Sequence, residues 1–292
     1  GYDVSLGVGH LLAREHKRPV EHSVSTFLTD AFLSWLDDRE SGWFAHLSYL
    51  RPHPPYSAAG EFGAKYAPDD LPLPIAPVDQ RHPLHELMLG IDDTAAPTDE
   101  GKSRWMRAQY LGMISEVDAQ LGRVWNALAA RGEWNDTIIV VTADHGEMLG
   151  DHGLRDKGGF FEQSQHIVGI VRVPGGAEGS VVNQFTENVD IMPTLGELLN
   201  VELPLQSDGR SLVPFLRGEA PNEWRDAAHW EFDWSPLVIP LGEFPWPHDR
   251  RLSTYALTVR RDDTHAYVQR GAHWKHDPTW CWKKHRPCCN GE

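Results

Sequence analysis

The feature that most constrains the fold is a long helical pattern that runs into a β-branched segment. Between residues 99 and 131, apolar side chains recur at helical spacing, and Gly132 follows as a stop signal. The apolar stripe consists of Tyr110, Met113, Ile114, Val117, Leu121, Val124, Trp125 and Leu128. Every residue of 137–142, TIIVVT, is β-branched, which is typical of a central strand in a parallel sheet. This order predicts a layered α/β fold.

Further segments continue the alternation of helix and strand. The sequence predicts a helix over 25–39, a strand over 43–50, a second parallel strand over 166–175 and a helix over 190–200. Ser25 or Thr26 is available as the N-cap of the first helix, and Asp190 as that of the last. We therefore expect a mostly parallel sheet with helices on both faces and right-handed crossovers.

Composition and predicted secondary structure change along the sequence and divide the chain into three parts. Residues 1–220 carry the α/β pattern, with a long Pro-rich loop after residue 52. Residues 221–271 predict a small antiparallel subdomain, in which Arg261, Asp262 and Asp263 form a turn. Residues 272–292 form an atypical tail that contains all three cysteines, and its Cys and His spacing matches no common zinc finger. We expect this tail to be foreign to the rest of the chain.

The charge balance narrows the classes of partner. The chain has 27 Lys and Arg against 42 Asp and Glu, a net charge of −15, and no basic stripe. Nucleic acid and an anionic membrane surface are therefore not expected partners, and no apolar run is long enough to cross a membrane. The body of the chain has no disulfide framework, so localisation leans towards the cytoplasm. Oligomeric state stays open, a homo-oligomer included.

The residues after the strand 137–142 could bind a metal. In parallel sheets, ligands bind beyond the carboxyl ends of the strands, and Asp144, His145 and Gly146 lie at that position. Asp supplies a hard oxygen and His a nitrogen, a combination that suits Mn²⁺, Zn²⁺ or Fe²⁺ somewhat better than Ca²⁺. The alternative is structural: Asp144 could cap the following turn while His145 is merely exposed.

Two further side chains could act on an anionic substrate. Lys157 could meet an anionic oxygen, or it could be an ordinary solvated lysine. His53 could donate a hydrogen bond or a proton to a leaving group, but 16 histidines are present and any one of them could be incidental. Asp151 and His152 repeat the Asp-His-Gly pattern without a preceding strand, so we expect them to stabilise the loop.

Several motifs in order resemble one family. They are HLSYLRPHPPY, VTADHGEMLGDHGLRDKGGFFEQSQHIVGIVRVPG, ENVDIMPTLGELLNVELPLQSDGRSLVPFLRG and HWEFDW. Together they resemble the sulfatase and phosphonate monoester hydrolase group of the alkaline phosphatase-like superfamily. The resemblance implies hydrolysis of a small anionic ester, a sulfate or a phosphonate or phosphate monoester, at a divalent ion such as Ca²⁺, Mn²⁺ or Zn²⁺. It implies that Asp144 and His145 are metal ligands and that Lys157 and His53 contact the substrate.

The chain departs from that family in one respect that matters for chemistry. The family's nucleophile is a formylglycine made in a Cys/Ser-x-Pro-x-Arg segment, and no Cys or Ser here begins that pattern. The acidic residues that complete the family's metal site are also missing, so we expect a C-terminal fragment that is inactive alone. Two other interpretations stay open: a non-catalytic module that binds a metal or an anion, and a phosphodiesterase.

Overall fold

The protein is described by a computed structural model that covers residues 19–157, 160–204, 207–233, 256–270, 280–283 and 286–287. These residues form two compact units. The first comprises the described residues within Gly1–Pro77, Leu87–Thr137 and Glu147–Asp156, and the second comprises those within Val78–Glu86, Ile138–Gly146 and Lys157–Glu292. The domain limits predicted at residues 220 and 271 rest on changes in composition and predicted secondary structure, and they stay a prediction.

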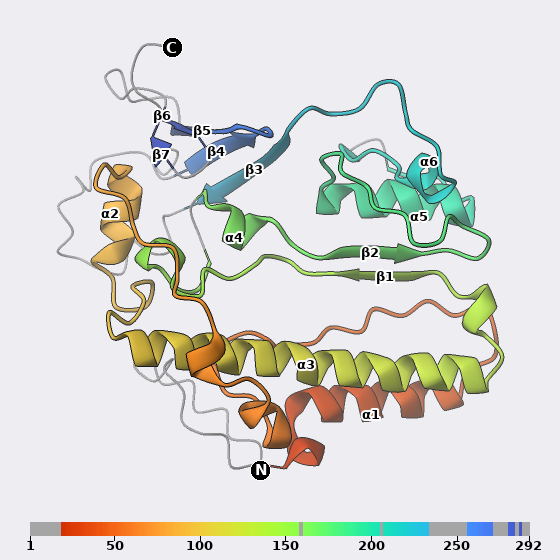
Figure 1. The fold of residues 1–292 in the computed structure, drawn as a ribbon. Helices are drawn as coiled ribbons and strands as arrows, with labels where there is room; N and C mark the ends of the chain where they lie inside the picture. The colour runs from red at the N-terminus through yellow and green to blue at the C-terminus, as the bar shows by residue number, and fades with distance from the viewer. Residues whose placement is uncertain are drawn as a thin grey trace. The chain divides into compact units, whose positions relative to one another are not determined.

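Two long helices dominate the first unit, as the sequence predicts. Helices α1 (Val24–Asp37) and α3 (Glu100–Ala130) lie side by side (Figure 1). Short 3-10 helices complete this unit: η1 (Val20–His22), η2 (Gly60–Ala64), η3 (Pro68–Asp70), η4 (Trp134–Asp136) and η5 (Asp151–Gly153). Helix α2 (Pro83–Leu89) crosses the boundary between the units.

The N-cap of α1 differs from the prediction. Ser23 caps the helix, because its hydroxyl accepts a hydrogen bond from the backbone N–H of Thr26 at 3.1 Å. The predicted caps, Ser25 and Thr26, both lie inside the first turn. The apolar spacing located the helix but could not choose among three neighbouring hydroxyl residues.

The predicted strand 43–50 is extended but does not join a sheet in the described part of the chain. Its side chains alternate between half-buried and exposed, as one covered face of an extended segment requires. Phe44 and Leu50 lie on its exposed side. The prediction of a strand covered on both faces is therefore wrong, because an apolar composition does not supply a neighbouring strand.

The long Pro-rich loop is attached to α3 by buried polar side chains. The Gln109 amide accepts from the backbone N–H of Ala58 at 3.1 Å and donates to the carbonyl of Gly63 at 2.8 Å. A Cβ at Gly112 would lie 2.4 Å from the carbonyl oxygen of Phe62, so only glycine permits this approach. Around these contacts Tyr56, Ala58, Phe62, Met106 and Met113 form a buried cluster.

The second unit contains the strand that ends at the predicted metal ligands. Strands β1 (Ile139–Thr142) and β2 (Gly169–Arg172) form a two-stranded sheet (Figure 1). They pair antiparallel, with Val140 opposite Val171, so the predicted parallel arrangement of these two strands is wrong. In the connection between them, the described residues form only two short helices, η5 and α4 (Glu162–Gln165), whereas a parallel neighbour is usually reached through a longer crossover helix.

The C-terminal strands form an antiparallel sheet, as the sequence predicts for residues up to 270. The order is β3 (Ala228–Asp233), β4 (Ala256–Arg261), β5 (His265–Arg270), β6 (Trp280–Lys283) and β7 (Arg286–Pro287). The predicted turn joins β4 to β5, and Asp262 accepts there from the backbone N–H groups of Thr264 and His265. Strands β6 and β7 belong to the segment expected to be a foreign tail, and the side chains of that segment, its cysteines included, lie outside the described residues.

Helix α5 (Ile191–Leu199) confirms the last predicted helix, and Asp190 lies at its N-cap position but does not cap it with its side chain. Asp190 is fully buried and makes no side-chain cap bond to α5. Its carboxylate instead joins a capping box with Glu187 across the 3-10 helix η6 (Asn188–Asp190). The remaining helix, α6 (Val213–Leu216), follows in the same unit.

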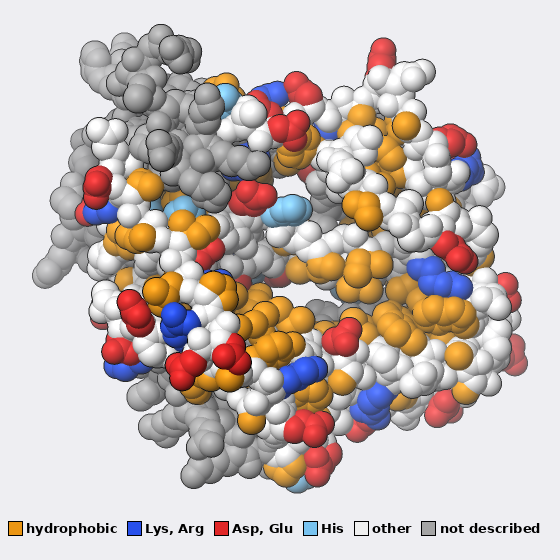
Figure 2. Space-filling view, viewed as in Figure 1, with side chains coloured by type: hydrophobic (Ala, Val, Ile, Leu, Met, Phe, Trp, Pro, Cys, Tyr) orange, Lys and Arg blue, Asp and Glu red, His pale blue; other side chains and the backbone are white. Residues whose placement is uncertain are grey.

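The surface in Figure 2 shows acidic and basic side chains of the described residues scattered among apolar ones. No helix in this part of the chain is both long enough and apolar enough to span a membrane. The expectations that nucleic acid and membranes are not partners stay predictions.

Candidate functional site

The candidate site is built on the loop that leaves β1. Asp144 and His145 are adjacent in the chain, and their side chains converge, with Asp144 Oδ2 lying 3.5 Å from His145 Nε2. The backbone N–H of His145 donates to Asp144 Oδ1 at 3.0 Å, which orients the carboxylate. The Asp144 side chain is 88% exposed and that of His145 is 26% exposed, so the pair is open to solvent.

The backbone beside His145 determines which ring nitrogen of the neutral imidazole faces Asp144. His145 Nδ1 is 2.8 Å from the carbonyl oxygen of Gly146. A carbonyl oxygen only accepts, so in the neutral ring Nδ1 carries the proton and Nε2 presents its lone pair to the carboxylate. Two acceptors then face each other, and a cation between them satisfies both. Metal-binding histidines commonly have this arrangement, in which a backbone carbonyl fixes the tautomer.

The Asp144–His145 pair fits a divalent ion as part of a ligand set. Metal bonds to carboxylate oxygen and imidazole nitrogen are about 2.0–2.2 Å long, and a 3.5 Å separation lets both atoms reach one ion. Among the residues that the structure describes, no group of three or more His, Cys, Asp or Glu side chains could hold a metal. The predicted ligands therefore come together as a pair, and the described residues do not complete the set.

The backbone on the far side of the pair is fixed by Gly146. Its N–H donates to the carbonyl oxygen of Ser164 at 2.8 Å. A Cβ at this position would lie 2.2 Å from the carbonyl oxygen of Gln163, so any side chain would force the two segments apart. The glycine of the Asp-His-Gly motif is thus required by close backbone packing.

His53 lies in the first unit, in a turn that is attached to α3. Arg51 Nη1 donates to the carbonyl oxygens of His53 and Pro55 at 3.0 and 2.8 Å and contacts Met113 Sδ. Burial lowers the pKa of Arg51, and the nearby carboxylate of Glu116 opposes that shift. His53 Nδ1 is 2.7 Å from the carbonyl oxygen of Pro54, so His53 also presents Nε2.

Lys157 is the first residue of the second unit after the Asp-His-Gly loop. It occupies a bend and is half-buried. The glycines that follow it, Gly158 and Gly159, lie outside the described residues. Asp144, His145 and Lys157 therefore belong to the second unit and His53 to the first, and the predicted roles of Lys157 and His53 stay predictions.

The second Asp-His-Gly sequence stabilises the loop, as expected. Asp151 Oδ1 accepts from the backbone N–H of Ile75 and from Arg107 Nη1, both at 3.0 Å. His152 has a positive φ of 56° and donates its backbone N–H to the carbonyl of Ile75 at 2.7 Å. This copy of the motif therefore connects the Pro-rich loop to α3 instead of facing solvent as a pair.

A half-buried carboxylate that sequence reasoning missed lies in the same loop. The hydroxyl of Tyr56 donates to Glu147 Oε1 at 3.0 Å. Burial raises the pKa of Glu147 to about 7, and the nearby charge of Asp156 contributes in the same direction. Burial also raises the pKa of Tyr56. No local sequence signal distinguishes Glu147 from the other acidic residues of the loop, because its burial depends on distant residues.

Known proteins match the chain over most of its length. The family model described as Sulfatase matches residues 11–201. The multifunctional alkaline phosphatase superfamily protein PehA of Trinickia caryophylli is 40% identical over 270 residues, which cover 86% of this chain and 52% of that protein. An arylsulfatase of Clostridium perfringens is 32% identical over 229 residues, 75% of this chain and 47% of the relative. The chain thus spans about half the length of these curated relatives.

Solved structures agree with the sequence relatives. The phosphonate monoester hydrolase of Agrobacterium radiobacter superposes with a TM-score of 0.81 at 34% identity, covering 96% of this chain and 58% of that one. This likeness confirms the predicted α/β fold class, that of the alkaline phosphatase-like proteins. The family model covers well over half of the chain and agrees with the relatives, so the chain belongs to the sulfatase family.

Proposed function

We propose that the chain supplies one part of the metal site and the anion-contacting residues of a metal-dependent hydrolase. Its substrates would be sulfate esters or phosphonate and phosphate monoesters. The observation that carries the proposal is the Asp144–His145 pair, in which Nε2 and a carboxylate oxygen lie 3.5 Å apart while the opposite ring nitrogen contacts the carbonyl of Gly146. Family membership and the likeness to a phosphonate monoester hydrolase support both substrate classes.

Each side chain then has a defined task. Asp144 and His145 would hold the divalent ion, which supplies positive charge to the ester's anionic oxygens when it is bound. Lys157 would add a second positive charge against those oxygens. In the neutral ring of His53, Nδ1 carries the proton and donates it to the carbonyl oxygen of Pro54. His53 can therefore donate from Nε2 to a leaving oxygen only as the imidazolium. No Cys or Ser in the sequence begins a Cys/Ser-x-Pro-x-Arg segment, so the formylglycine nucleophile would come from outside these 292 residues.

A second function, a non-catalytic module that binds a metal and an anion, uses the same residues. The absence of the Cys/Ser-x-Pro-x-Arg pattern favours this second function. It differs from the hydrolase only in that no nucleophile or further ligand from outside the chain completes the site. The phosphodiesterase interpretation is weaker, because none of the described contacts favours a diester.

The test combines anion binding with turnover. Calorimetric titration of the 292-residue chain with phenylphosphonate and with sulfate, each with and without Mn²⁺, should show binding that depends on the metal. Lys157→Gln should weaken it at least about tenfold, since it removes a charge-assisted contact. Lys102→Gln, which changes an exposed lysine at the start of α3, is the matched control and should leave anion binding unchanged.

Turnover separates the candidate functions. The chain alone should release no nitrophenol from 4-nitrophenyl sulfate or from 4-nitrophenyl phenylphosphonate. Turnover by the chain alone would exclude the non-catalytic module and would contradict a nucleophile supplied from outside. Anion binding that ignores both Mn²⁺ and Lys157 would contradict the proposed site itself.

A further inference from the structure

The backbone before Asp144 is attached to a distant residue, Asn188. Asn188 Nδ2 donates to the carbonyl oxygen of Ala143 at 2.8 Å, and Asn188 Oδ1 accepts from the hydroxyl of Thr142 at 2.8 Å. The two ends of a short loop are therefore fixed by hydrogen bonds, Ala143 by Asn188 and Gly146 by the carbonyl of Ser164. Asp144 and His145 are the two residues between these anchors.

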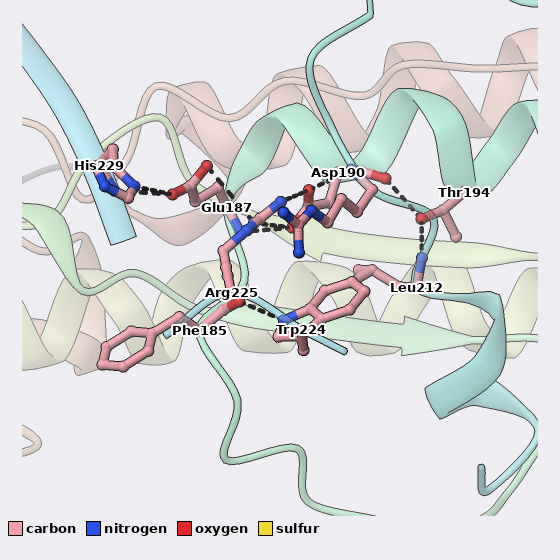
Figure 3. A network of polar contacts seen from close by, with 9 residues as sticks. Phe185, Glu187, Asp190, Thr194, Leu212, Trp224, Arg225 and His229 are labelled. Carbon is pink, nitrogen blue, oxygen red and sulfur yellow. Dashed lines mark hydrogen bonds and ion pairs between the residues drawn. The ribbon is translucent and has the colours of Figure 1, made fainter. Parts of the chain in front are cut away.

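Asn188 is the first residue of η6, whose position is set by a buried ion pair. Figure 3 shows Arg225 pointing at the carboxylate of Asp190, with Glu187 beside it. Arg225 donates from both terminal nitrogens, Nη1 to Oδ2 at 2.5 Å and Nη2 to Oδ1 at 2.6 Å. Asp190 is fully buried and the Arg225 side chain is 9% exposed. Bidentate pairs of this kind fix geometry more tightly than single contacts.

The same carboxylate gathers backbone donors from both sides of η6. Asp190 accepts from the backbone N–H groups of Glu187 at 2.9 Å and Arg210 at 2.8 Å. A Cβ at Gly209 would lie 2.0 Å from the carbonyl oxygen of Val189, so the chain before Arg210 packs directly on the backbone of η6. The turn that carries Asn188 is thus held by side-chain and backbone contacts at once.

We propose that Asn188 is a positioning residue for the Asp144–His145 pair. It transmits the rigidity of the Asp190–Arg225 ion pair to the carbonyl of Ala143 and so holds the loop in the conformation in which both side chains face one point. The inference rests on the proposed metal-binding role of that pair, and it adds a residue that itself touches neither metal nor substrate. Outer partners of metal ligands typically change metal affinity about 10–100-fold when they are removed.

The first experiment measures the loop without any metal. Amide hydrogen exchange of the peptide that covers 138–147 is followed by mass spectrometry in the metal-free chain and in Asn188→Ala. Amide exchange at 143–146 should become at least about fivefold faster. The loop of the variant can open without first breaking the hydrogen bonds to Asn188, so it opens more often. Asn183→Ala, which changes an exposed asparagine of the same unit, is the matched control and should leave the peptide unchanged.

The amide exchange rate of β3 shows whether the unit stays folded. If Asn188 served only the stability of the unit, exchange would become faster in β3 and in the loop together. If Asn188→Ala unfolds the unit, Thr142→Val provides the test, since it removes one bond to Asn188 and leaves η6 intact. Unchanged exchange at 143–146 in a folded variant would overturn the inference.

The second experiment measures Mn²⁺ affinity by electron paramagnetic resonance. Asn188→Ala should raise the dissociation constant at least about tenfold while Asn183→Ala leaves it unchanged. If Asn188→Ala exchanges faster but the unchanged chain binds no Mn²⁺, the proposed function is contradicted, while the role of Asn188 in holding the loop is still supported. Unaltered affinity in Asn188→Ala would contradict a positioning role even if the unchanged chain binds the metal.

Discussion

The position of one ring proton decides what His145 can bind. Because Gly146 accepts from Nδ1, the neutral ring can offer only Nε2, and Nε2 faces Asp144. His53 shows the same arrangement with Pro54. Both candidate histidines therefore have their reactive nitrogen selected by the backbone of the next residue, a local contact that needs no other element.

The lowered pKa of Asp262, in the β4–β5 turn, makes the stability of the chain depend on pH. Burial alone would raise its pKa, but hydrogen bonds from the backbone N–H groups of Thr264 and His265, with Arg260, lower it to about 2. The unfolded carboxyl titrates near 3.8. The stabilisation is therefore fully present above pH 3.8 and is lost as the pH falls towards 2.

Urea unfolding from pH 6 to pH 3 tests this expectation with Asp262→Asn. The variant should be less stable by roughly 1 kcal/mol at pH 6, a value reduced by partial exposure of the carboxylate to water, and the difference should shrink below about pH 4. Asp263→Asn changes the exposed neighbour and should show no such convergence. A difference that grows as the pH falls would contradict the assignment.

Local sequence signals point to candidate residues such as Asp144 and His145, whose role stays a prediction, whereas residues defined by distant contacts carry no such signal. Asp144 and His145 are candidates because they follow a β-branched strand and precede a glycine. Asn188 is not, because its contact with Ala143 joins residues far apart in the chain. Asp190 does occupy the N-cap position of α5, but its carboxylate engages the distant Arg225 instead of capping the helix, which a local rule could not foresee.

At the scale of elements, periodic helices were predictable and strand partners were not. The apolar stripe located α3 almost to the residue, since helix formation is local. The same reasoning predicted a strand at 43–50 and a parallel pair for β1 and β2, and both were wrong. Pairing and direction depend on connections and neighbours, which a short apolar run does not encode.

Helix α3 offers a matched pair of substitutions. A Cβ at Gly112 would lie 2.4 Å from the carbonyl oxygen of Phe62, whereas a Cβ at Gly122 meets nothing within 4 Å. Gly122→Ala should stabilise the chain by about 0.5–1 kcal/mol through helix propensity. Gly112→Ala should destabilise it despite the same gain in propensity, because the Pro-rich loop must move away.

Equilibrium unfolding in urea measures both variants. Opposite signs are expected, and the Tyr56 cluster is expected to become more exposed only in Gly112→Ala. Equal stabilisation by the two alanines would show that the loop does not pack on α3 as described.

At the scale of the whole molecule, the candidate residues are divided between two units. His53 belongs to the first, and Asp144, His145 and Lys157 belong to the second. The chain spans about half the length of its curated relatives, and among its described residues the two predicted ligands have no third His, Cys, Asp or Glu beside them to complete a metal site. Its family membership follows from sequence, whereas its chemistry depends on whether those two ligands bind an ion.

The most direct test of that claim is a Mn²⁺ titration of the 292-residue chain, followed by the electron paramagnetic resonance signal of the free ion. We predict saturable binding of one ion per chain, weakened at least about tenfold by Asp144→Asn and by His145→Gln. His166→Gln, which changes an exposed histidine of the same unit, should bind like the unchanged chain. Absence of saturable binding, or equal binding by all three variants, would contradict a metal site at Asp144 and His145.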